Sequence, residues 1–338
     1  MLPRPLLALT MLSALCTFLP AAAGPLASQA AAEPREVRAW LMRIHEAASH
    51  RNFQGTFIVS AGGAVSSARI AHFCEGPNQF ERIDSLDGQT RHVFRYNEVV
   101  HTLWPQARVA MIEQRDQLTS FPALLQIGDD RIAEFYEVRQ TGIDRVAGYE
   151  AAVLLVRPRD NFRFGYRLWA EKTSNLLLRA DVLSEKGELL ETSAFSDVAI
   201  DVKSQPDAVL APMRKLDGYR IVRPAMTPTK LEAEGWSLRQ GVPGFRQVSC
   251  VKRPLDGATE AESPGGAEAL QTIFSDGLTY VSLFIEPYSP ERHTRQMLSS
   301  IGATQTLMRK QGDWWITVVG DVPAATLKAF AGGLERKK

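Results

Sequence analysis

Short extended runs follow one another with only tight turns between them, and this spacing constrains the fold more than any other feature. In residues 53–60 (FQGTFIVS), successive residues alternate with the period-2 pattern of a half-buried strand. Further runs are predicted at 68–74, 79–84, 90–96, 98–104 and 108–114, with turn signals at 62–63, 76–77 and 87–88. Parallel strands need longer crossover connections, so the spacing predicts an antiparallel meander.

The same pattern continues to about residue 200. A helix opened by Glu33-Pro34 precedes it, and a short helical pattern near 121–125 interrupts it. Strands are then predicted at 134–139, 149–157, 164–171, 176–183 and 189–198. We therefore expect a first domain over residues 33–203, built on one large antiparallel sheet with few helices.

A second, smaller α+β domain is predicted over residues 223–335. Prolines gather between the two domains, so residues 204–222 are interpreted as a partly packed linker. Ser289 with Pro290 predicts the start of a helix that ends before Gly302, and Asp321 with Pro323 predicts the start of another. Strands are predicted at 236–238, 245–252, 270–275, 278–285 and 314–319, with a polar loop at 256–266.

The first 23 residues have the pattern of an export signal. Arg4 precedes an apolar run that is too short to span a membrane, and small residues at 21–23 suit cleavage, although a second cleavage point after Ala32 stays open. Removing Arg4 lowers Lys+Arg from 39 to 38 against 38 Asp+Glu, so the mature chain has no net charge. A nucleic-acid partner, which needs a basic surface, is not expected.

The cysteines allow one disulfide bond, but the sequence does not decide whether it forms. Cys16 leaves with the signal, and Cys74 and Cys250 remain in a compartment that permits disulfides. A bond between them would tie the two domains together, but its Cα atoms must lie within about 7 Å. Separate burial of the two thiols is the alternative.

Histidines raise the question of a metal. His45 and His50 resemble a zinc-protease box, yet they lie five residues apart, which places them on different helix faces. A metal site could also be assembled from strand residues, but nothing in their spacing requires them to converge, and a polar sheet face is the preferred interpretation. These residues are His72, His92 and His101, with Asp84 or Glu98.

The sequence contains no G-x-S-x-G elbow, P-loop, dinucleotide-binding glycine motif or paired C-x-x-C. An exported hydrolase would need a nucleophile or metal that the sequence does not reveal. These absences together argue against an enzyme, and no cofactor is expected.

Large apolar side chains are concentrated on the first predicted sheet. If the sheet curls around an incompletely filled interior, they would line a concave pocket for an acyl chain or an apolar peptide. An ordinary hydrophobic core is the alternative for each residue. They are Phe57, Phe73, Phe80, Phe94, Trp104, Met111, Phe164, Tyr166 and Trp169.

Several segments together resemble one family. They are NFQGTF at 52–57, YRLW at 166–169, LLR at 177–179, EKGE at 185–188, FSDGL at 274–278 and VSLF at 281–284. In this order, over nearly the whole mature chain, they resemble the RseB/MucB family of periplasmic negative regulators of the sigma-E envelope stress response. The family's domain break falls where the composition of this chain changes.

The resemblance implies a fold and an activity. The first domain would be an open half-barrel similar to the lipoprotein carriers LolA and LolB, followed by a smaller mixed domain. The protein would bind the periplasmic segment of an RseA/MucA-type anti-sigma factor and shield it from a DegS-type protease. Lipid or lipopolysaccharide would release that segment. No catalytic residues come with the resemblance, and a homo-oligomer stays open.

Site residues follow from this interpretation. The predicted lipid pocket comprises Phe57, Phe80, Trp104, Met111, Tyr166 and Trp169, with phosphate partners Arg82, Arg91 and Arg95. For the arginines, a solvated strand face is the alternative. The predicted partner-binding residues are Ser275, Asp276, Gly277, Tyr280 and Phe284. A LolA-like lipid or lipoprotein carrier is the alternative function, although it leaves the second domain unexplained.

Overall fold

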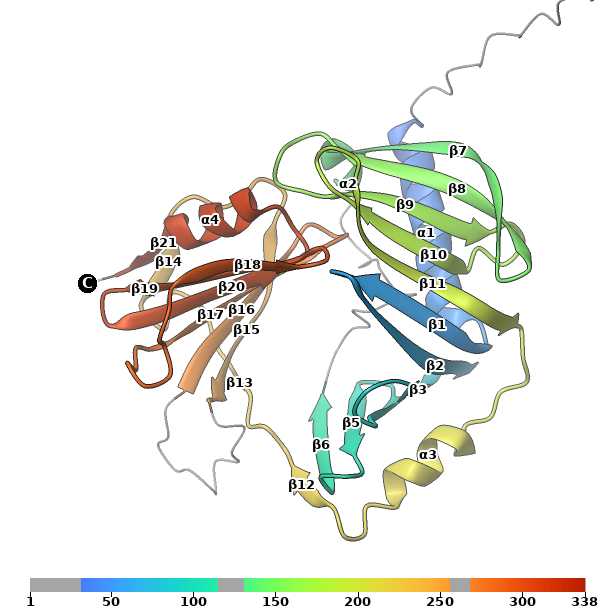
Figure 1. Cartoon of the computed structure of the whole chain (residues 1–338), viewed down its shortest axis with the longest axis horizontal. Helices are drawn as coiled ribbons and strands as arrows, with labels where there is room; N and C mark the ends of the chain where they lie inside the picture. Colours follow the sequence, from blue (N-terminus) through green and yellow to red (C-terminus); the bar gives the residue numbers. More distant parts are fainter. Residues whose placement is uncertain (1–31, 115–130, 256–267, 338) are drawn as a thin grey trace, which may run out of the picture.

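The computed structural model describes residues 32–114, 131–255 and 268–337. The predicted signal (1–23), short helix (121–125) and polar loop (256–266) lie outside the described residues. Within the described residues, no helix has both the length and the apolar character needed to cross a membrane. Two units are visible in Figure 1, an N-terminal unit of residues 32–222 and a C-terminal unit of residues 223–337.

One twelve-stranded sheet forms the N-terminal unit. Its order is β12-β6-β5-β4-β3-β2-β1-β11-β10-β9-β8-β7, and every pair is antiparallel except β12 with β6. The strands are β1(Phe53–Ala61), β2(Ala64–Glu75), β3(Asn78–Ser85), β4(His92–Tyr96), β5(Val99–Trp104), β6(Val109–Gln114), β7(Tyr136–Val146), β8(Tyr149–Pro158), β9(Gly165–Glu171), β10(Leu177–Leu183), β11(Leu189–Ile200) and β12(Arg220–Val222). The sheet stays open, and the predicted antiparallel fold class is confirmed.

Helix α1 (Pro34–His50) covers one face of this sheet, which we call the inner face (Figure 1). Its apolar stripe buries Val37, Leu41 and Ile44 to 2–4% exposure. These side chains belong to one hydrophobic core together with Phe53 and Ile70. Buried residues of β7 to β11 form the rest of this core. The short helix α2 (Ile132–Phe135) leads into β7.

Helix α3 (Asp207–Arg214) packs on the opposite, outer face, over β3 and β4. Its Val209 is fully buried with Phe73, Phe80 and Phe94. Residues 204–222, predicted as a partly packed linker, are packed more fully than that, because α3 and then β12 are integral to the N-terminal unit. Burying the apolar side chains of residues 204–222 against the aromatic outer face is more favourable in free energy than leaving them in water.

A seven-stranded sheet forms the C-terminal unit, in the order β13-β15-β16-β17-β20-β19-β18. Its strands are β13(Thr227–Pro228), β15(Arg246–Pro254), β16(Glu268–Ser275), β17(Tyr280–Pro287), β18(Met297–Ile301), β19(Thr304–Gln311) and β20(Trp314–Gly320). Helix α4 (Ala324–Gly333) covers one face, and β14(Trp236–Leu238) pairs with β21(Leu334–Arg336). Phe330 of α4 is fully buried in this core.

The helix predicted between Ser289 and Gly302 is wrong, because the segment begins with a turn and ends in strand β18 at residues 297–301. Only a turn forms at Ser289, whose carbonyl accepts the backbone N–H groups of Arg292 and His293. Gly302 has φ +59° and makes the tight turn to β19. Cross-strand apolar pairing of β18 with β19, including Leu298 opposite Leu307, outweighs the local helix signal.

The structure contradicts the disulfide, since both cysteines are free. Cys74 lies in β2, where its thiol contacts the carbonyl of Ser49 at 3.1 Å. Cys250 lies in β15 and is buried in the core of the other unit. Burial raises the pKa of both thiols, so both stay protonated at neutral pH.

We expect two free thiols in the mature, non-reduced chain. Alkylation of the unfolded chain without reductant adds two groups by mass spectrometry. Half-buried Cys74 reacts before buried Cys250 in the native chain, because exposure controls access. A chain that reacts only after reduction would contradict the assignment.

Candidate functional site

Four of the predicted pocket residues share the inner face of the large sheet. Cross-strand partners lie on one face, and the register joins Phe57 with Ala68 of β2, and Met111 with Thr102 of β5. Trp104 lies two residues beyond Thr102 and therefore points to the same side. Phe57, Trp104 and Met111 are half-buried rather than fully packed. They supply apolar surface that an acyl chain could cover.

Tyr166 also lies on the inner face but is fully packed. Its register partners are Val156 and Val182, and its side chain is 5% exposed. Burial, reinforced by the nearby carboxylates of Asp321 and Asp276, raises the pKa of its hydroxyl. Tyr166 therefore belongs to the junction between the units rather than to an open pocket.

Phe80 and Trp169 lie on the outer face, away from the other predicted pocket residues. Phe80 stacks on Tyr96 at 5.1 Å and packs under α3. Trp169 lies under the guanidinium of Arg179 and donates its indole N–H to Asp144 at 3.0 Å. Both aromatic rings are occupied by packing within the chain, so the predicted single pocket is wrong for these two residues.

The predicted arginines are divided in the same way. Arg82 lies on the outer face, where it pairs with Asp84 at 2.8 Å and covers the ring of Phe94. Arg91 is exposed next to β4. Arg95 points to the inner face, is 7% exposed, and donates to the carbonyl of Asn97. Of the two arginines within strands, Arg95 faces the side of the half-buried apolar residues and Arg82 does not.

A buried polar row crosses the inner face at this point. His72 pairs in register with Glu81, and Glu81 pairs with Arg95. Burial raises the pKa of Glu81 to about 7 against the opposing charge of Arg95. Burial, with the positive charges of Arg95 and His50, lowers the pKa of His72 to about 4. The sequence predicted His72 as part of a polar sheet face, with a metal site as the less favoured alternative, and it did not predict this row.

The other histidines do not join it. His92 contacts Asp84 at 2.6 Å, and His101 lies on the outer face of β5. His45 contacts Ser49, and His50 contacts the carbonyl of Glu46. Over residues 32–114, 131–255 and 268–337, no three His, Cys, Asp or Glu side chains are grouped to hold a metal.

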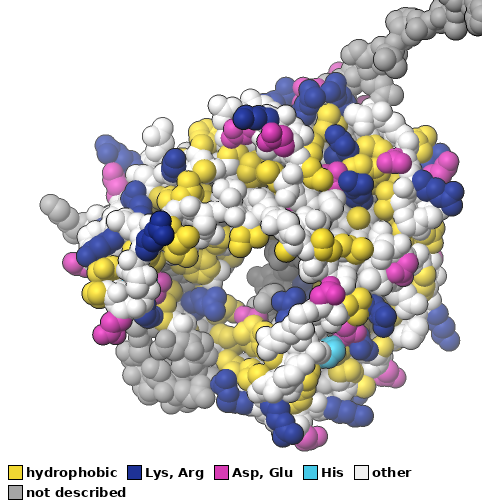
Figure 2. All heavy atoms as spheres, in the orientation of Figure 1, with side chains coloured by type: hydrophobic (Ala, Val, Ile, Leu, Met, Phe, Trp, Pro, Cys, Tyr) yellow, Lys and Arg dark blue, Asp and Glu magenta, His cyan; other side chains and the backbone are white. Residues whose placement is uncertain are grey.

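One open depression of 640 Å³ lies at the end of α1. Its lining includes the charged pair Arg51 and Asp201, which lie 2.9 Å apart, and the thiol of Cys74. It is largely polar and is therefore not the predicted apolar pocket. Figure 2 shows a separate opening between the two units, with hydrophobic side chains near its rim.

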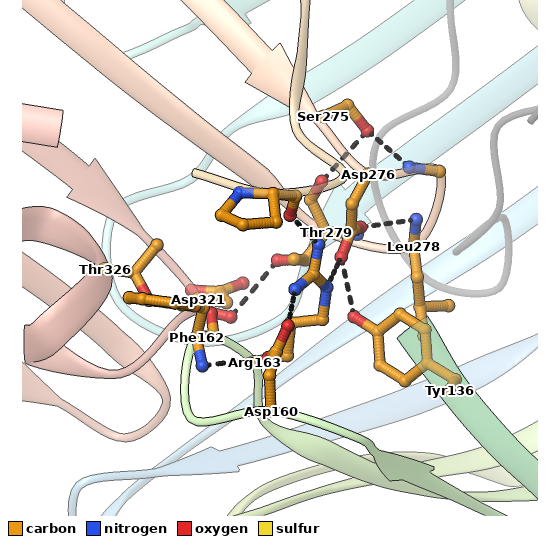
Figure 3. Close-up of polar contacts among 12 residues, drawn as sticks. Tyr136, Asp160, Phe162, Arg163, Ser275, Asp276, Leu278, Thr279, Asp321 and Thr326 are labelled. Carbon is orange, nitrogen blue, oxygen red and sulfur yellow. Dashed lines mark hydrogen bonds and ion pairs between the residues drawn. The ribbon is translucent and has the colours of Figure 1, made fainter. Parts of the chain in front are cut away.

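The two units are joined by the Arg163 cluster, which consists of Arg163, Asp160, Asp276 and Tyr136 (Figure 3). Arg163, in the loop between β8 and β9, is fully buried and its Nε lies 2.7 Å from the carboxylate of Asp276 in the C-terminal unit. It also contacts Asp160 beside it. Tyr136 of β7 donates its hydroxyl to the same carboxylate at 2.8 Å. Both charges are thus paired away from water.

Aromatic rings and a backbone carbonyl complete the surroundings of Arg163. Its guanidinium lies 4.4 Å from the ring of Phe135 and 4.9 Å from that of Phe245. It also donates to the carbonyl of Pro243. The next residue, Gly244, has φ +83°, and an added Cβ would lie 2.3 Å from the guanidinium. Only glycine fits this approach.

The turn predicted to bind the partner is occupied by this junction. Ser275, Asp276 and Gly277 are all buried. Asp276 accepts the backbone N–H groups of Leu278 and Thr279, while Ser275 donates to the carbonyl of Thr279. The prediction is therefore corrected for these three residues, because their polar groups are used in holding the turn and the units.

Apolar residues are exchanged across the same junction. Leu278 of the C-terminal unit is part of the N-terminal core, and Phe162 packs against the C-terminal core. Thr326 of α4 donates to the carbonyl of Phe162 at 2.7 Å. A second contact joins two hairpin tips, where a Cβ added to Gly302 would lie 2.7 Å from Cβ of Ala61. The units therefore meet at two separate places.

Tyr280 and Phe284 lie on the sheet face opposite α4. Both belong to β17 at alternate positions, and both are half-buried. Phe284 pairs with Thr317, which pairs with Met308, which in turn pairs with Met297. This row gives the C-terminal unit an apolar surface on its helix-free face.

Two family models match most of the chain. The MucB/RseB N-terminal domain matches residues 36–213, and the MucB/RseB C-terminal domain matches residues 230–335. The chain belongs to the MucB/RseB family. This confirms the resemblance drawn from the quoted segments.

Named relatives of this family are regulators of sigma factors. The sigma factor AlgU regulatory protein MucB of Pseudomonas aeruginosa is 28% identical over 313 residues, covering 91% of this chain and 93% of the relative. The sigma-E factor regulatory protein RseB of Escherichia coli K12 is 24% identical over 303 residues, covering 88% and 90%. Both matches extend across the two units.

Solved structures of MucB have the same fold. The crystal structure of MucB in complex with MucA(peri) has a TM-score of 0.64 at 27% identity and covers 89% of this chain and 99% of that one. The Pseudomonas aeruginosa MucA/MucB complex has a TM-score of 0.66 at 27% identity and covers 90% and 99%. The MucB/RseB architecture therefore includes both units of this chain.

Replacing Arg163 should weaken the junction strongly. Arg163→Met leaves the carboxylate of Asp276 buried without its partner, so the free energy of unfolding should fall by about 3–5 kcal/mol. Urea unfolding followed by tryptophan fluorescence measures this loss. Arg159→Met, in the same loop but exposed, is the matched control and should change little. A loss below about 1 kcal/mol for Arg163→Met would contradict the assigned role.

The buried polar row predicts opposite pH dependences for two variants. Glu81 binds its proton more tightly in the folded chain (pKa about 7 against 4.5), so its contribution to stability is lost as pH rises from 4.5 to 7. His72 resists protonation (about 4 against 6.5), so its contribution is lost as pH falls from 6.5 to 4. Each shift is worth about 3 kcal/mol, and together they largely cancel.

Glu81→Gln should therefore leave the pH dependence of His72 uncompensated. This variant should gain stability relative to the native chain as pH rises from about 4.5 to about 7. His72→Gln should leave the pH dependence of Glu81 uncompensated. This variant should lose stability relative to the native chain over the same pH range. Urea midpoints at about pH 4.5 and about pH 7 measure both slopes. Slopes of the same sign in the two variants would refute this electrostatic assignment.

Proposed function

We propose that this chain is a periplasmic regulator that binds the periplasmic segment of a MucA/RseA-type anti-sigma factor and shields it from a DegS-type protease. Lipid or lipopolysaccharide would favour release of that segment. The chain would act by binding and not by catalysis. Export by the predicted signal would bring it to the periplasm.

The similarity to the MucB–MucA(peri) structure is the observation that carries this proposal. This similarity covers 89% of this chain at 27% identity, so it extends over both units and is not limited to the large sheet. Relatives named as sigma-factor regulators are matched over the same length. A carrier that used the large sheet alone would not account for the retained C-terminal unit.

The Arg163 cluster supports a binding mechanism that needs a fixed arrangement of the units. A surface made of two parts binds a segment more tightly when its parts are held in place beforehand. The buried ion pair and the exchanged residues Leu278 and Phe162 provide that restraint. A ligand that favours another arrangement would lower the affinity for the segment, and the coupling would be reciprocal.

The inner face of the large sheet supports the lipid part of the proposal. Phe57, Trp104 and Met111 offer half-buried apolar surface there, and Arg95 lies buried on the same side, opposite Glu81. Apolar walls with few polar groups are typical of acyl-chain sites. Phe80, Arg82 and Trp169 are not part of this site, because they lie on the outer face.

Binding can be tested with the mature chain and the periplasmic segment of the host's own MucA-type anti-sigma factor. We expect a complex of micromolar affinity or tighter by isothermal titration calorimetry, and slower cleavage of the segment by the host's DegS-type protease. A scrambled segment of the same composition is the control. No binding, together with transfer of lipid between vesicles, would favour the LolA-like carrier instead.

Competition by lipid tests the second part. Lipopolysaccharide added to the preformed complex should lower the affinity for the segment, and the segment should lower the affinity for lipopolysaccharide by the same factor. Met111→Asp should weaken this competition. Ile112→Asp, the adjacent half-buried residue on the outer face, is the control. Equal competition in both variants would remove the inner face as the lipid site.

A further inference from the structure

Strand β18 forms an unprotected edge of the C-terminal sheet. Within the described residues it pairs with β19 alone, so its other side presents backbone N–H and C=O groups that no strand uses. Its sequence, MLSSI, contains no charged residue and no proline, and its register with β19 has no bulge. Met297, Leu298 and Ile301 are 40%, 45% and 70% exposed.

The other edges of the two large sheets are protected. β12 and β13 are only three and two residues long, and β13 ends in Pro228. β7 is long, but it has a bulge between Gln140 and Gly142 and carries Asp144 and Arg145 near its end. Short length, bulges and charges are the usual means of preventing edge pairing. β18 uses none of them.

Two apolar rows of the sheet end at β18. On the face covered by α4, the row runs through Val318 and Leu307 to Leu298. Val318 is fully buried, Leu307 is half-buried and Leu298 is 45% exposed. On the other face, the row from Phe284 ends at Met297. One additional strand would cover both ends of these rows.

Charge indicates what kind of strand would pair there. Residues 288–311 contain four cations and one carboxylate, Glu291. The cations are Arg292, which lies 3.6 Å from the carboxylate of Glu286, and Arg295, Arg309 and Lys310. A second copy paired through β18 would bring an uncharged strand, MLSSI, that offers these cations no carboxylate, whereas an acidic segment would be attracted to them.

We propose that β18 is the docking edge for an extended, acidic segment with apolar residues at alternate positions, which adds to the sheet as an eighth strand. Building on the proposed function, we identify this segment as part of the anti-sigma factor's periplasmic region. Backbone hydrogen bonds would give affinity, and contacts with Leu298 and Met297 would give register. The helix-free face with Phe284 would continue the contact.

Substitutions on two edge strands test the proposal. Leu298→Asp and Met297→Asp in the full mature chain should each weaken binding of the host's anti-sigma segment at least about tenfold, or about 1.4 kcal/mol. Ile143→Asp, on the protected edge β7 and 58% exposed, is the matched control and should bind like the native chain. Thermal unfolding of each variant verifies that the fold is kept.

Hydrogen exchange separates strand addition from a side-chain contact. Outward-facing amides in 297–301 should become protected when the segment binds, while those of β7 should not change. Native-like binding by both β18 variants, or a bound segment without this protection, would overturn the docking edge and leave the proposed function intact. Failure of the native chain to bind the segment would overturn both. A dimer that the two substitutions dissolve would show a second copy on β18 instead.

Discussion

A buried ion pair lies at the centre of the main contact between the two units of this chain. Arg163 and Asp276 are both fully buried, although neither belongs to the regular strands or helices. Two desolvated charges are costly unless further hydrogen bonds complete them. Tyr136, Asp160 and the carbonyl of Pro243 provide those bonds, and Gly244 provides the space. The cost of burial is offset only when the units meet in this one arrangement.

That constraint connects the fold to the proposed regulation. The large sheet offers an apolar inner face, and the small sheet offers an open edge at β18 and a helix-free apolar face. Because the Arg163 cluster holds the units together, a ligand at one unit can influence the other only by acting through their junction. Hairpin tips at Gly62 and Gly302 form the second contact through which such coupling would pass.

Local patterns predicted the strands well and the long-range contacts poorly. The period-2 alternation and tight turns located the strands of the large sheet because both are properties of neighbouring residues. Tyr166 and Trp169 were predicted to line one pocket, although they lie three residues apart in one strand and the same alternation puts them on opposite faces. Arg163 and Asp276 lie 113 residues apart, and nothing local marks such a pair. β18 was interpreted as a helix because Ser289-Pro290 is a strong local signal, whereas its pairing with β19 is tertiary.

Hydrogen exchange of the whole mature chain, with and without the anti-sigma periplasmic segment, tests the central claim most directly. We predict that the backbone amides at 275–279 exchange slowly in both states, since the junction holds, and that new protection appears in the C-terminal unit when the segment binds. Fast exchange at 275–279 in the free chain, or no new protection at saturating segment, would contradict the account.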